Sequence, residues 1–276
     1  GAGMMDCKKA LGETDGNMDE AVKYLREKGI SKAEKKASRI AAEGLCCAVV
    51  DGKTAAVVEV NSETDFVAKN ETFQQFVEAV AKQAVESDSA DIDAFLEEKW
   101  NEDTSKTVKE ALVDKIAVIG EKLSIRRFEK VTEENGAVVT YVHGGGRIGV
   151  IVDAETAVVN DAVKEALSNI AMQVAALNPQ YVATSDISEE FKAHEREIMK
   201  AQIEQDPKMA GKPEKVIAGA IEGRLNKELK EVCLLEQIYV KAEDGKQIVA
   251  KYLEQVGKEN GTEIKIKKFV RFETGE

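Results

Sequence analysis

The chain has 276 residues, and 39 lysines and arginines against 51 aspartates and glutamates give it a formal net charge of −12. A chain this acidic is not expected to bind nucleic acid directly, because its charge does not neutralise phosphates. No apolar run reaches the roughly 20 residues of a membrane span, and no signal segment opens the chain. We therefore expect a cytoplasmic protein of two or three compact units that does not contact membranes.

Motifs for chemistry are scarce. No GxxxxGK[ST] phosphate loop and no GxSxG nucleophile motif occurs. The two histidines, His143 and His194, have no metal-ligand spacing to the cysteines, which are Cys7, Cys46, Cys47 and Cys233. We expect no metal, no cofactor and no catalytic side chain, and an enzyme that uses Cys46 or Cys47 is the least favoured alternative.

The N-terminal part predicts two short helices, at 4–11 and 18–28, with Asn17 as N-cap and Gly29 as the C-terminal stop. Two such helices bury little surface, so they suggest the remainder of a three-helix module whose first helix lies upstream. The basic segment 31–43 is either a phosphate-binding strip or a solvated linker helix. The linker is favoured, because no aromatic side chain interleaves to stack on bases.

The next part mixes strands and helices. Asp51-Gly52 between two apolar runs predicts a hairpin of strands 45–50 and 55–60. An amphipathic helix follows from Phe73 to Ala84. Two more helices are expected at 91–100 and 106–119, the second stopped by Gly120, and then a strand at 123–131.

This pattern repeats further along the chain. Strands are predicted at 137–142 and 147–152 around a turn at 143–146, followed by a helix at 157–177. Residues 52 and 146 align at an offset of 94. Gly120 matches Gly257 at an offset of 137 residues. Because this exceeds the first offset by 43, the second copy contains about 43 extra residues. These residues, 188–230, carry Pro207, Gly211 and Pro213 between two helical runs, which predicts an antiparallel helical hairpin.

The predicted fold class is α+β, with two related α+β subdomains and a protruding hairpin. The expected division is a helical module at 1–30, a linker at 31–44, a first core subdomain at 45–135, a second at 136–187 and 231–276, and the hairpin insertion at 188–230.

One loop is unusual for a solvent-facing connection. Residues 61–69 read NSETDFVAK between a strand and a helix. Thr64 or Asp65 is suited to cap a short turn there. Phe66 either enters the core or, with Asp65, faces a binding partner, since loops held by a scaffold often carry binding residues.

Four strings in the chain resemble the bacterial translation elongation factor Ts family. They are GAGMMDCKKAL at 1–11, ETDFVAK at 63–69, HGGGRIG at 143–149 and FVRFE at 269–273. The resemblance implies an N-terminal ubiquitin-associated-like helical module, two related core subdomains and a coiled-coil hairpin. By this resemblance we expect the first helix of the module to lie upstream of residue 1, and some members of the family continue into a C-terminal helix after the position of Glu276.

The resemblance also implies a function. The family binds the GDP form of elongation factor Tu, accelerates GDP release and leaves a nucleotide-free partner that GTP can enter. Asp65 and Phe66 are expected to enter the partner near its magnesium and phosphate region. The other contacts implied are Met4, Met5 and Lys8 with the nucleotide domain, Ile119 and Gly120 on the core surface nearby, and His143 with another domain of the partner.

Each of these assignments has an alternative. Met4 and Ile119 would otherwise be core residues, and His143 a turn residue. Met4 and Met5 cannot both face one small core, because successive helical positions differ by about 100°, so at least one is expected to be accessible. The alternative function is a non-catalytic adaptor or scaffold that uses the helical module and the coiled coil. A homodimer or a 2:2 assembly with the partner is also considered.

Overall fold

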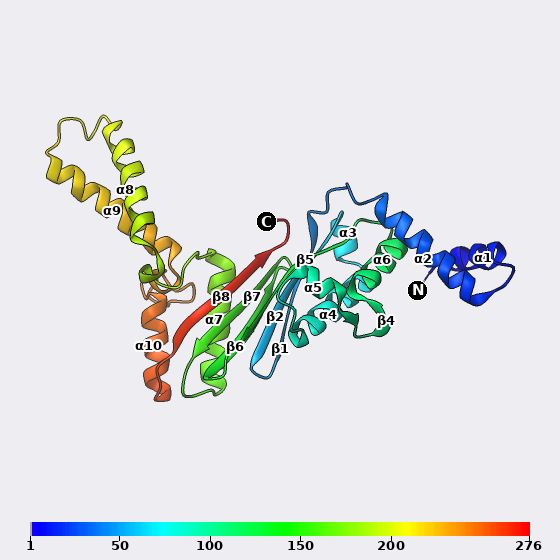
Figure 1. Ribbon diagram of the computed structural model, residues 1–276. Coiled ribbons are helices and arrows are strands. Elements are labelled where there is room, and N and C mark those ends of the chain that lie inside the picture. The colour runs from blue at the N-terminus through cyan, green and yellow to red at the C-terminus, as the bar shows by residue number, and fades with distance from the viewer. Residues whose placement is uncertain (1) are drawn as a thin grey trace. The chain divides into compact units, whose positions relative to one another are not determined.

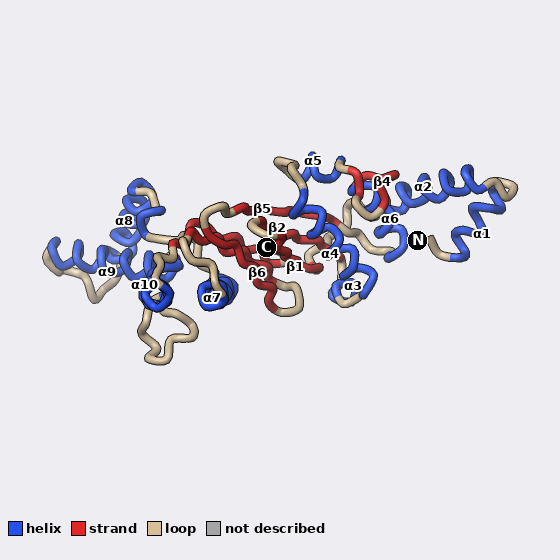
Figure 2. Tube along the Cα trace, turned by 90° about the horizontal axis from the view of Figure 1, so that it is seen from below, coloured by secondary structure: helices blue, strands red, loops and turns tan. Residues whose placement is uncertain are grey.

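The computed structural model describes residues 2–276 and has a mixed α+β fold with antiparallel pairing in its first sheet. The chain divides into two compact units. The first comprises residues up to Glu133 together with 138–151 and 270–276, and the second comprises 134–137 and 152–269. Figures 1 and 2 show the elements along the chain.

Two helices open the first unit, α1 (Met4–Glu13) and α2 (Met18–Glu34). Asn17 caps α2 as predicted, and its side chain accepts the Glu20 N–H at 3.1 Å. The prediction that Gly29 ends this helix is wrong. Gly29 is buried inside α2, and a Cβ there would lie 3.7 Å from Ala117, so the glycine allows close packing on the helix that contains Ala117.

The prediction of a linker helix at 31–43 is wrong beyond residue 34. Residues 31–34 are the last turn of α2, and turns and irregular chain follow before the first strand. The high charge of this segment favours solvent, and no apolar face holds it in a helix of its own.

The first sheet has the order β1-β2-β5, with β1 (Glu43–Asp51), β2 (Thr54–Ser62) and β5 (Ser124–Thr132). The predicted hairpin is confirmed, because Asp51 pairs with Thr54 across the two-residue turn. After its first residue, β2 is buried throughout. Both faces of this strand are covered, which explains its continuous apolar run.

One face of the sheet carries the main core of the unit. Helix α4 (Glu71–Glu86) packs there, and its buried side chains include Phe73, Phe76, Val77 and Val80, as the periodicity predicted. The other face forms a second cluster with residues of the later strands that belong to the same unit. It contains Cys46, Ala55, Val57, Val131, Val138, Ile151, Val270 and Phe272.

The segment between α4 and β5 differs from the prediction. Instead of a helix at 91–100 it contains α5 (Ile92–Glu97), then β3 (Lys99–Trp100) and β4 (Asp103–Thr107), before α6 (Val108–Ile119). The buried Gln83 side chain donates to the Lys99 carbonyl at 2.8 Å and accepts the Asn101 N–H at 2.9 Å. These tertiary hydrogen bonds hold residues 99–101 in an extended conformation.

The second sheet has the order β6-β7-β8, with β6 (Gly136–His143), β7 (Ile148–Glu155) and β8 (Lys265–Glu273), and the division between the units passes through these strands. The predicted turn after β6 is present. Its glycines Gly144, Gly145 and Gly146 all have positive φ, which favours glycine. At Gly146 a Cβ would lie 2.5 Å from Leu45, a contact within the first unit.

The second unit contains α7 (Asp161–Leu177) and α10 (Val249–Asn260), which pack on each other. The glycine that ends α10 is Gly261, in the left-handed conformation, as Gly120 ends α6. Gly257 lies inside α10, so the match of Gly120 to Gly257 is wrong, and Gly261 is the equivalent residue. Two 3-10 turns, Thr184–Asp186 and Leu234–Glu236, also belong to this unit.

Helices α8 (Glu189–Glu204) and α9 (Glu214–Val232) pack together and extend away from α7 and α10 of the same unit (Figure 1). Their shared apolar cluster contains Met199, Ile203, Ile221, Leu225 and Leu229, with Ile187 and Cys233 at its base. Within residues 2–276, no helix combines the length and the apolar character needed to cross a membrane.

Candidate functional site

The loop after β2 contains a single helical turn, α3 (Asp65–Ala68). Thr64 caps this turn, and its hydroxyl accepts the Val67 N–H at 3.4 Å. Ala68 is buried and Val67 packs against the core, whereas Phe66 is 81% exposed. The alternative that Phe66 enters the core is therefore wrong, and the turn presents this aromatic ring to solvent.

Asp65 lies beside Phe66 and is also exposed. Its carboxylate accepts a hydrogen bond from Lys69 Nζ at 2.7 Å. This hydrogen bond, with the charge of the same lysine, lowers the pKa of Asp65 below its ordinary value. The site thus carries an ionised carboxylate and an aromatic ring on adjacent residues.

Glu121 fixes the start of this loop. Its Oε2 accepts the backbone N–H groups of Glu63 at 3.0 Å and Thr64 at 3.1 Å, and its Oε1 accepts the Thr64 hydroxyl at 2.7 Å. All three donors belong to the two residues that precede α3. The loop is thereby attached to the segment between α6 and β5.

A second set of contacts runs in the opposite direction. Glu63 Oε1 accepts the Lys122 N–H at 2.6 Å and pairs with Arg39 at 3.3 Å. The hydrogen bond from Lys122, together with Arg39, lowers the pKa of Glu63. Lys122 Nζ in turn donates to the Arg39 carbonyl at 2.8 Å. We call Arg39, Glu63, Thr64, Glu121 and Lys122 the loop clamp.

The clamp brings two predicted site regions together. Gly120 ends α6 with φ 85° and is exposed, and it directly precedes Glu121. Ile119 is half-buried and packs against the core cluster. The alternative that Ile119 is a core residue is therefore correct for the buried part of its side chain. Asp65 and Phe66 therefore share one region of the first unit with Ile119 and Gly120.

The other predicted residues lie on different elements. Met4 and Met5 are 86% and 74% exposed on α1, which confirms that at least one is accessible and contradicts the core alternative for Met4. Lys8 is exposed on the same helix. Helix α1 packs on α2, and α2 packs on α6, so the module is joined to the helix that ends at Gly120.

His143 is the last residue of β6 and also begins the predicted turn, because its carbonyl accepts the Gly146 N–H at 3.3 Å, and its side chain is exposed. Its Nδ1 lies 2.9 Å from the Tyr141 hydroxyl, and the two rings are 5.9 Å apart. Both side chains lie on the same face of the strand, because residues two apart point the same way.

The structure disfavours thiol chemistry at Cys46 and Cys47. Burial raises the pKa of the Cys46 thiol to about 12 and that of Cys47 to about 11. Thiols with such pKa values are not ionised at neutral pH and are weak nucleophiles. Over the described residues, no three His, Cys, Asp or Glu side chains are grouped so that they could hold a metal ion.

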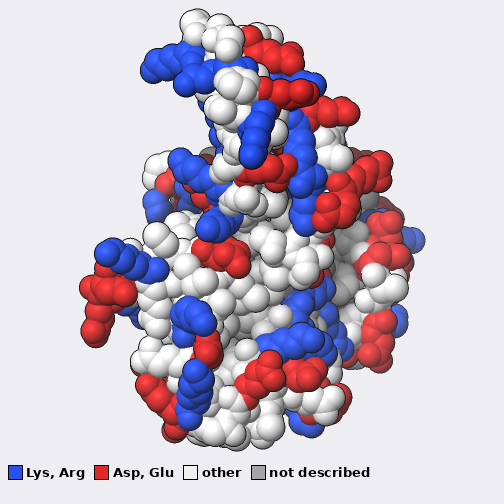
Figure 3. All heavy atoms as spheres, turned by 90° about the vertical axis from the view of Figure 1, so that its left-hand side faces the viewer, with Lys and Arg blue, Asp and Glu red and all other residues white. Residues whose placement is uncertain are grey.

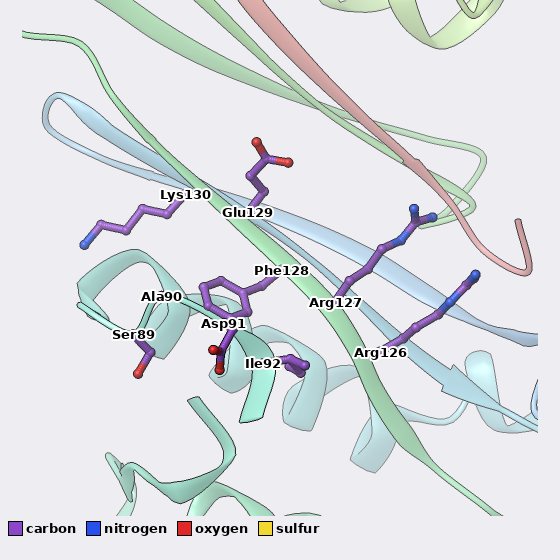
Figure 4. Close-up of a pocket in the computed structure, with 9 residues that line it drawn as sticks. All are labelled: Ser89, Ala90, Asp91, Ile92, Arg126, Arg127, Phe128, Glu129 and Lys130. Carbon is purple, nitrogen blue, oxygen red and sulfur yellow. The ribbon is translucent and has the colours of Figure 1, made fainter. Parts of the chain in front are cut away.

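A surface hollow of about 370 Å³ lies beside β5 (Figure 4). Its cationic side chains are already engaged, because Lys130 donates to the Ser87 carbonyl and both Arg126 and Arg127 pair with Glu59. We therefore do not assign it as a binding site. It is lined by Ser89, Ala90, Asp91, Ile92, Arg126, Arg127, Phe128, Glu129 and Lys130.

Charges of both signs alternate over the face drawn in Figure 3, including the helix pair at its top. Arg196 on α8 forms an ion pair with Glu222 on α9 at 2.6 Å. Arg224 on α9 forms another with Asp206, just after α8, at 3.8 Å. The visible face thus offers no continuous basic surface of the kind that tracks a phosphate backbone.

Comparison with known proteins decides the family. The family model described as "Elongation factor TS" matches residues 63–276. The chain is 51% identical to the elongation factor Ts of Clostridium novyi (strain NT) and 51% identical to that of Clostridioides difficile (strain 630). Each match covers 100% of this chain and 89% of the relative. A third, from Clostridium tetani (strain Massachusetts / E88), is 46% identical over 100% of the chain and 90% of the relative.

The chain belongs to the elongation factor Ts family. The resemblance noted in the sequence is thereby confirmed. An elongation factor Ts is a nucleotide exchange factor with elongation factor Tu as its partner, and it does not catalyse a chemical reaction. The chain therefore acts in protein synthesis.

The sequence pointed to Asp65 and Phe66 in this elongation factor Ts chain, but it did not single out Arg39, Glu63, Glu121 or Lys122 for a role in the site. Glu63 and Glu121 are 58 residues apart, and in a chain with 51 acidic residues neither stands out. The one available signal was position, since Glu121 and Lys122 directly follow the glycine that ends a predicted helix.

Proposed function

We propose that the chain binds elongation factor Tu in its GDP form and promotes GDP release by inserting Phe66, with Asp65 beside it, near the magnesium and phosphate site of the partner. GTP then enters and the exchange factor leaves. The observation that carries this proposal is that an 81% exposed phenylalanine stands on a loop whose preceding residues are held by the clamp.

The physical argument starts from the bound nucleotide. Its phosphates and magnesium ion are held by backbone donors and oxygen ligands in a fixed arrangement. A partner accelerates release when it stabilises an arrangement in which these contacts are already broken. A rigid aromatic ring does this well, because it gains burial, worth about 2 kcal/mol for a phenylalanine, while it displaces what was there.

Asp65 adds a negative charge on the adjacent residue. Its carboxylate is ionised, since Lys69 lowers its pKa. A carboxylate near the nucleotide raises the energy of the phosphates by repulsion, and it also competes for their hydrogen-bond donors. The nearby Lys69 offsets part of this charge, so we assign Asp65 a smaller role than Phe66.

Exchange on this account is a coupling between two binding equilibria. If the factor weakens nucleotide binding to its partner, the nucleotide must weaken binding of the factor by the same ratio. We therefore propose that the nucleotide-free partner is bound more tightly than the GDP form. Met4, Met5, Lys8, Ile119, Gly120 and His143 supply further contacts, and their exposed or half-exposed positions support this role.

We further propose that α1 and α2 belong to a ubiquitin-associated-like module, and that α8 and α9 form an antiparallel coiled coil. The close packing of each helix pair supports both assignments. The division at 1–30, 31–44, 45–135, 136–187 with 231–276, and 188–230 remains our proposed domain plan. A cytoplasmic location, and a homodimer or a 2:2 assembly with the partner, complete the proposal.

The test is the release of a fluorescent GDP from purified elongation factor Tu, with and without this protein. An exchange factor accelerates release in proportion to its concentration until saturation. Release that continues at the spontaneous rate, despite binding, would identify a scaffold instead.

A further inference from the structure

We propose that Glu121 is a positioning residue for exchange, because its carboxylate fixes the loop from which Phe66 projects. This inference rests on the proposed function, and it assigns a role to a residue that does not itself meet the nucleotide site. Glu121 acts through Glu63 and Thr64, which directly precede α3.

The geometry supports a holding role for this one carboxylate. Helix α3 has only four residues, and such a turn does not hold its own conformation in water. Its N-terminal side is fixed from outside, since Glu121 accepts three hydrogen bonds within 3.1 Å from Glu63 and Thr64. Hydrogen bonds to an ionised acceptor are about twice as strong as neutral ones.

The anchor is itself held firmly. Glu121 follows Gly120, which ends α6, and the next residues enter β5, so the carboxylate is attached to two packed elements. Lys122 donates its N–H back to Glu63 at 2.6 Å. Residues 63–64 thus donate backbone N–H groups to the side chain of Glu121, and Lys122 donates its backbone N–H to the side chain of Glu63. These opposed hydrogen bonds restrict sliding of the two segments as well as their separation.

The consequence concerns how Phe66 uses its binding energy. A ring on a fixed loop needs little ordering when it enters a partner, whereas a ring on a mobile loop must first be ordered at an entropic cost. A small misplacement of a group at a functional site lowers rates by much more than it lowers affinity. Loss of the Glu121 carboxylate should therefore slow exchange although every proposed contact residue is still present.

The test compares Glu121→Ala with Glu121→Gln. The amide oxygen of glutamine can still accept both backbone N–H groups, and its NH₂ can donate to the Thr64 hydroxyl. The matched control is Glu110→Ala. Glu110 accepts the Thr107 N–H at 2.9 Å in the capping box at the N-terminal end of α6. The control substitution therefore removes a similar hydrogen bond, but at the end of the helix opposite to Gly120, about 18 Å away along the helix axis.

Two readouts are needed on the 276-residue chain. Amide hydrogen exchange of Glu63 and Thr64 reports the clamp without any partner. GDP release from elongation factor Tu over a range of factor concentrations separates the maximum rate from the half-saturating concentration. Fluorescence of Trp100, the single tryptophan, which is buried in the same unit, verifies folding.

We expect Glu121→Ala to speed amide exchange at Glu63 and Thr64 about tenfold and to lower the maximum release rate about tenfold, with a smaller change in half-saturation. Glu121→Gln should keep most of both parent values, and Glu110→Ala should affect the Thr107 amide alone. Unchanged protection at Glu63 and Thr64, or a parent maximum rate in folded Glu121→Ala, would overturn the positioning role. If the parent protein itself fails to accelerate release, the proposed function is wrong, and this role falls with it.

Discussion

Glu59 Oε2 accepts a hydrogen bond from Arg127 Nε at 2.6 Å, and the side chain of Glu59 has no exposed surface. Its Oε1 accepts from Arg126, Asn61 and the Gly275 N–H at 3.0–3.2 Å. The C-terminal segment that belongs to the first unit is thus bound to the central strand β2 through one buried carboxylate.

Removal of this carboxylate should destabilise the first unit. Breaking a buried ion pair costs about 3–5 kcal/mol, and we expect the lower end for Glu59→Ala because both arginines are partly exposed to solvent. Urea unfolding monitored at Trp100 measures the loss. An unchanged midpoint and slope would show that water replaces the carboxylate without cost.

The same carboxylate makes stability depend on pH. Burial alone would raise the pKa of Glu59, but hydrogen bonds from Asn61, Gly275 and Arg127 outweigh it and lower the pKa below the ordinary 4.5. A lowered pKa contributes stability above the unfolded value, and this contribution disappears as the pH falls through the folded value. The difference in unfolding free energy between the parent and Glu59→Gln should therefore be full at pH 7 and shrink below about pH 4.5. A difference that stays constant from pH 7 to pH 3 contradicts this assignment.

The helix pair α8 and α9 should be removable. Its apolar cluster is largely shared between the two helices, so replacing residues 188–230 by a short Gly/Ser link removes both partners together. We expect the thermal transition of Trp100, in the other unit, to shift by only a few degrees. Circular dichroism should meanwhile lose only the helical signal of the pair. Loss of cooperative unfolding at Trp100 would show that the pair is integral to the fold.

Met4 and Met5 should contribute to binding rather than to folding. Both are exposed on α1, where flexible thioethers adapt to a partner surface. Changing both to alanine is expected to weaken binding to nucleotide-free elongation factor Tu about tenfold, equal to about 1.4 kcal/mol. Met18→Ala, at a 67% exposed methionine on α2, is the matched control. Equal losses in all variants, or reduced helicity, would assign these methionines to packing of the module.

Local patterns predicted most elements of the fold. The hairpin at Asp51-Gly52, the buried face of α4 and the strand that became β5 depend on turn chemistry and apolar periodicity within one segment. The errors concern glycines that look like helix stops but lie inside helices. Gly29 looks like a helix stop, but α6 packs against it, and Gly257 lies inside α10, where a Cβ would meet the Thr262 carbonyl at 2.5 Å.

The candidate site was predictable in part. The sequence indicated that Asp65 and Phe66 leave a strand on a short polar loop, but burial and exposure of Phe66 were both open. Its orientation depends on Val67 and Ala68 filling the core side of α3, and on Glu121, which approaches from a segment more than 50 residues away. No local pattern contains that information.

The central claim is that Phe66 acts on the nucleotide site of the partner, and its most direct test is the maximum rate of GDP release with Phe66→Ala. Stopped-flow release of a fluorescent GDP at several factor concentrations measures this rate, and circular dichroism verifies the fold. We predict a decrease of about tenfold, a barrier change of about 1.4 kcal/mol, with a smaller loss of affinity for the nucleotide-free partner and a smaller effect of Asp65→Asn. Folded Phe66→Ala that releases GDP at the parent rate would contradict the account and assign exchange to the wider contacts with the partner.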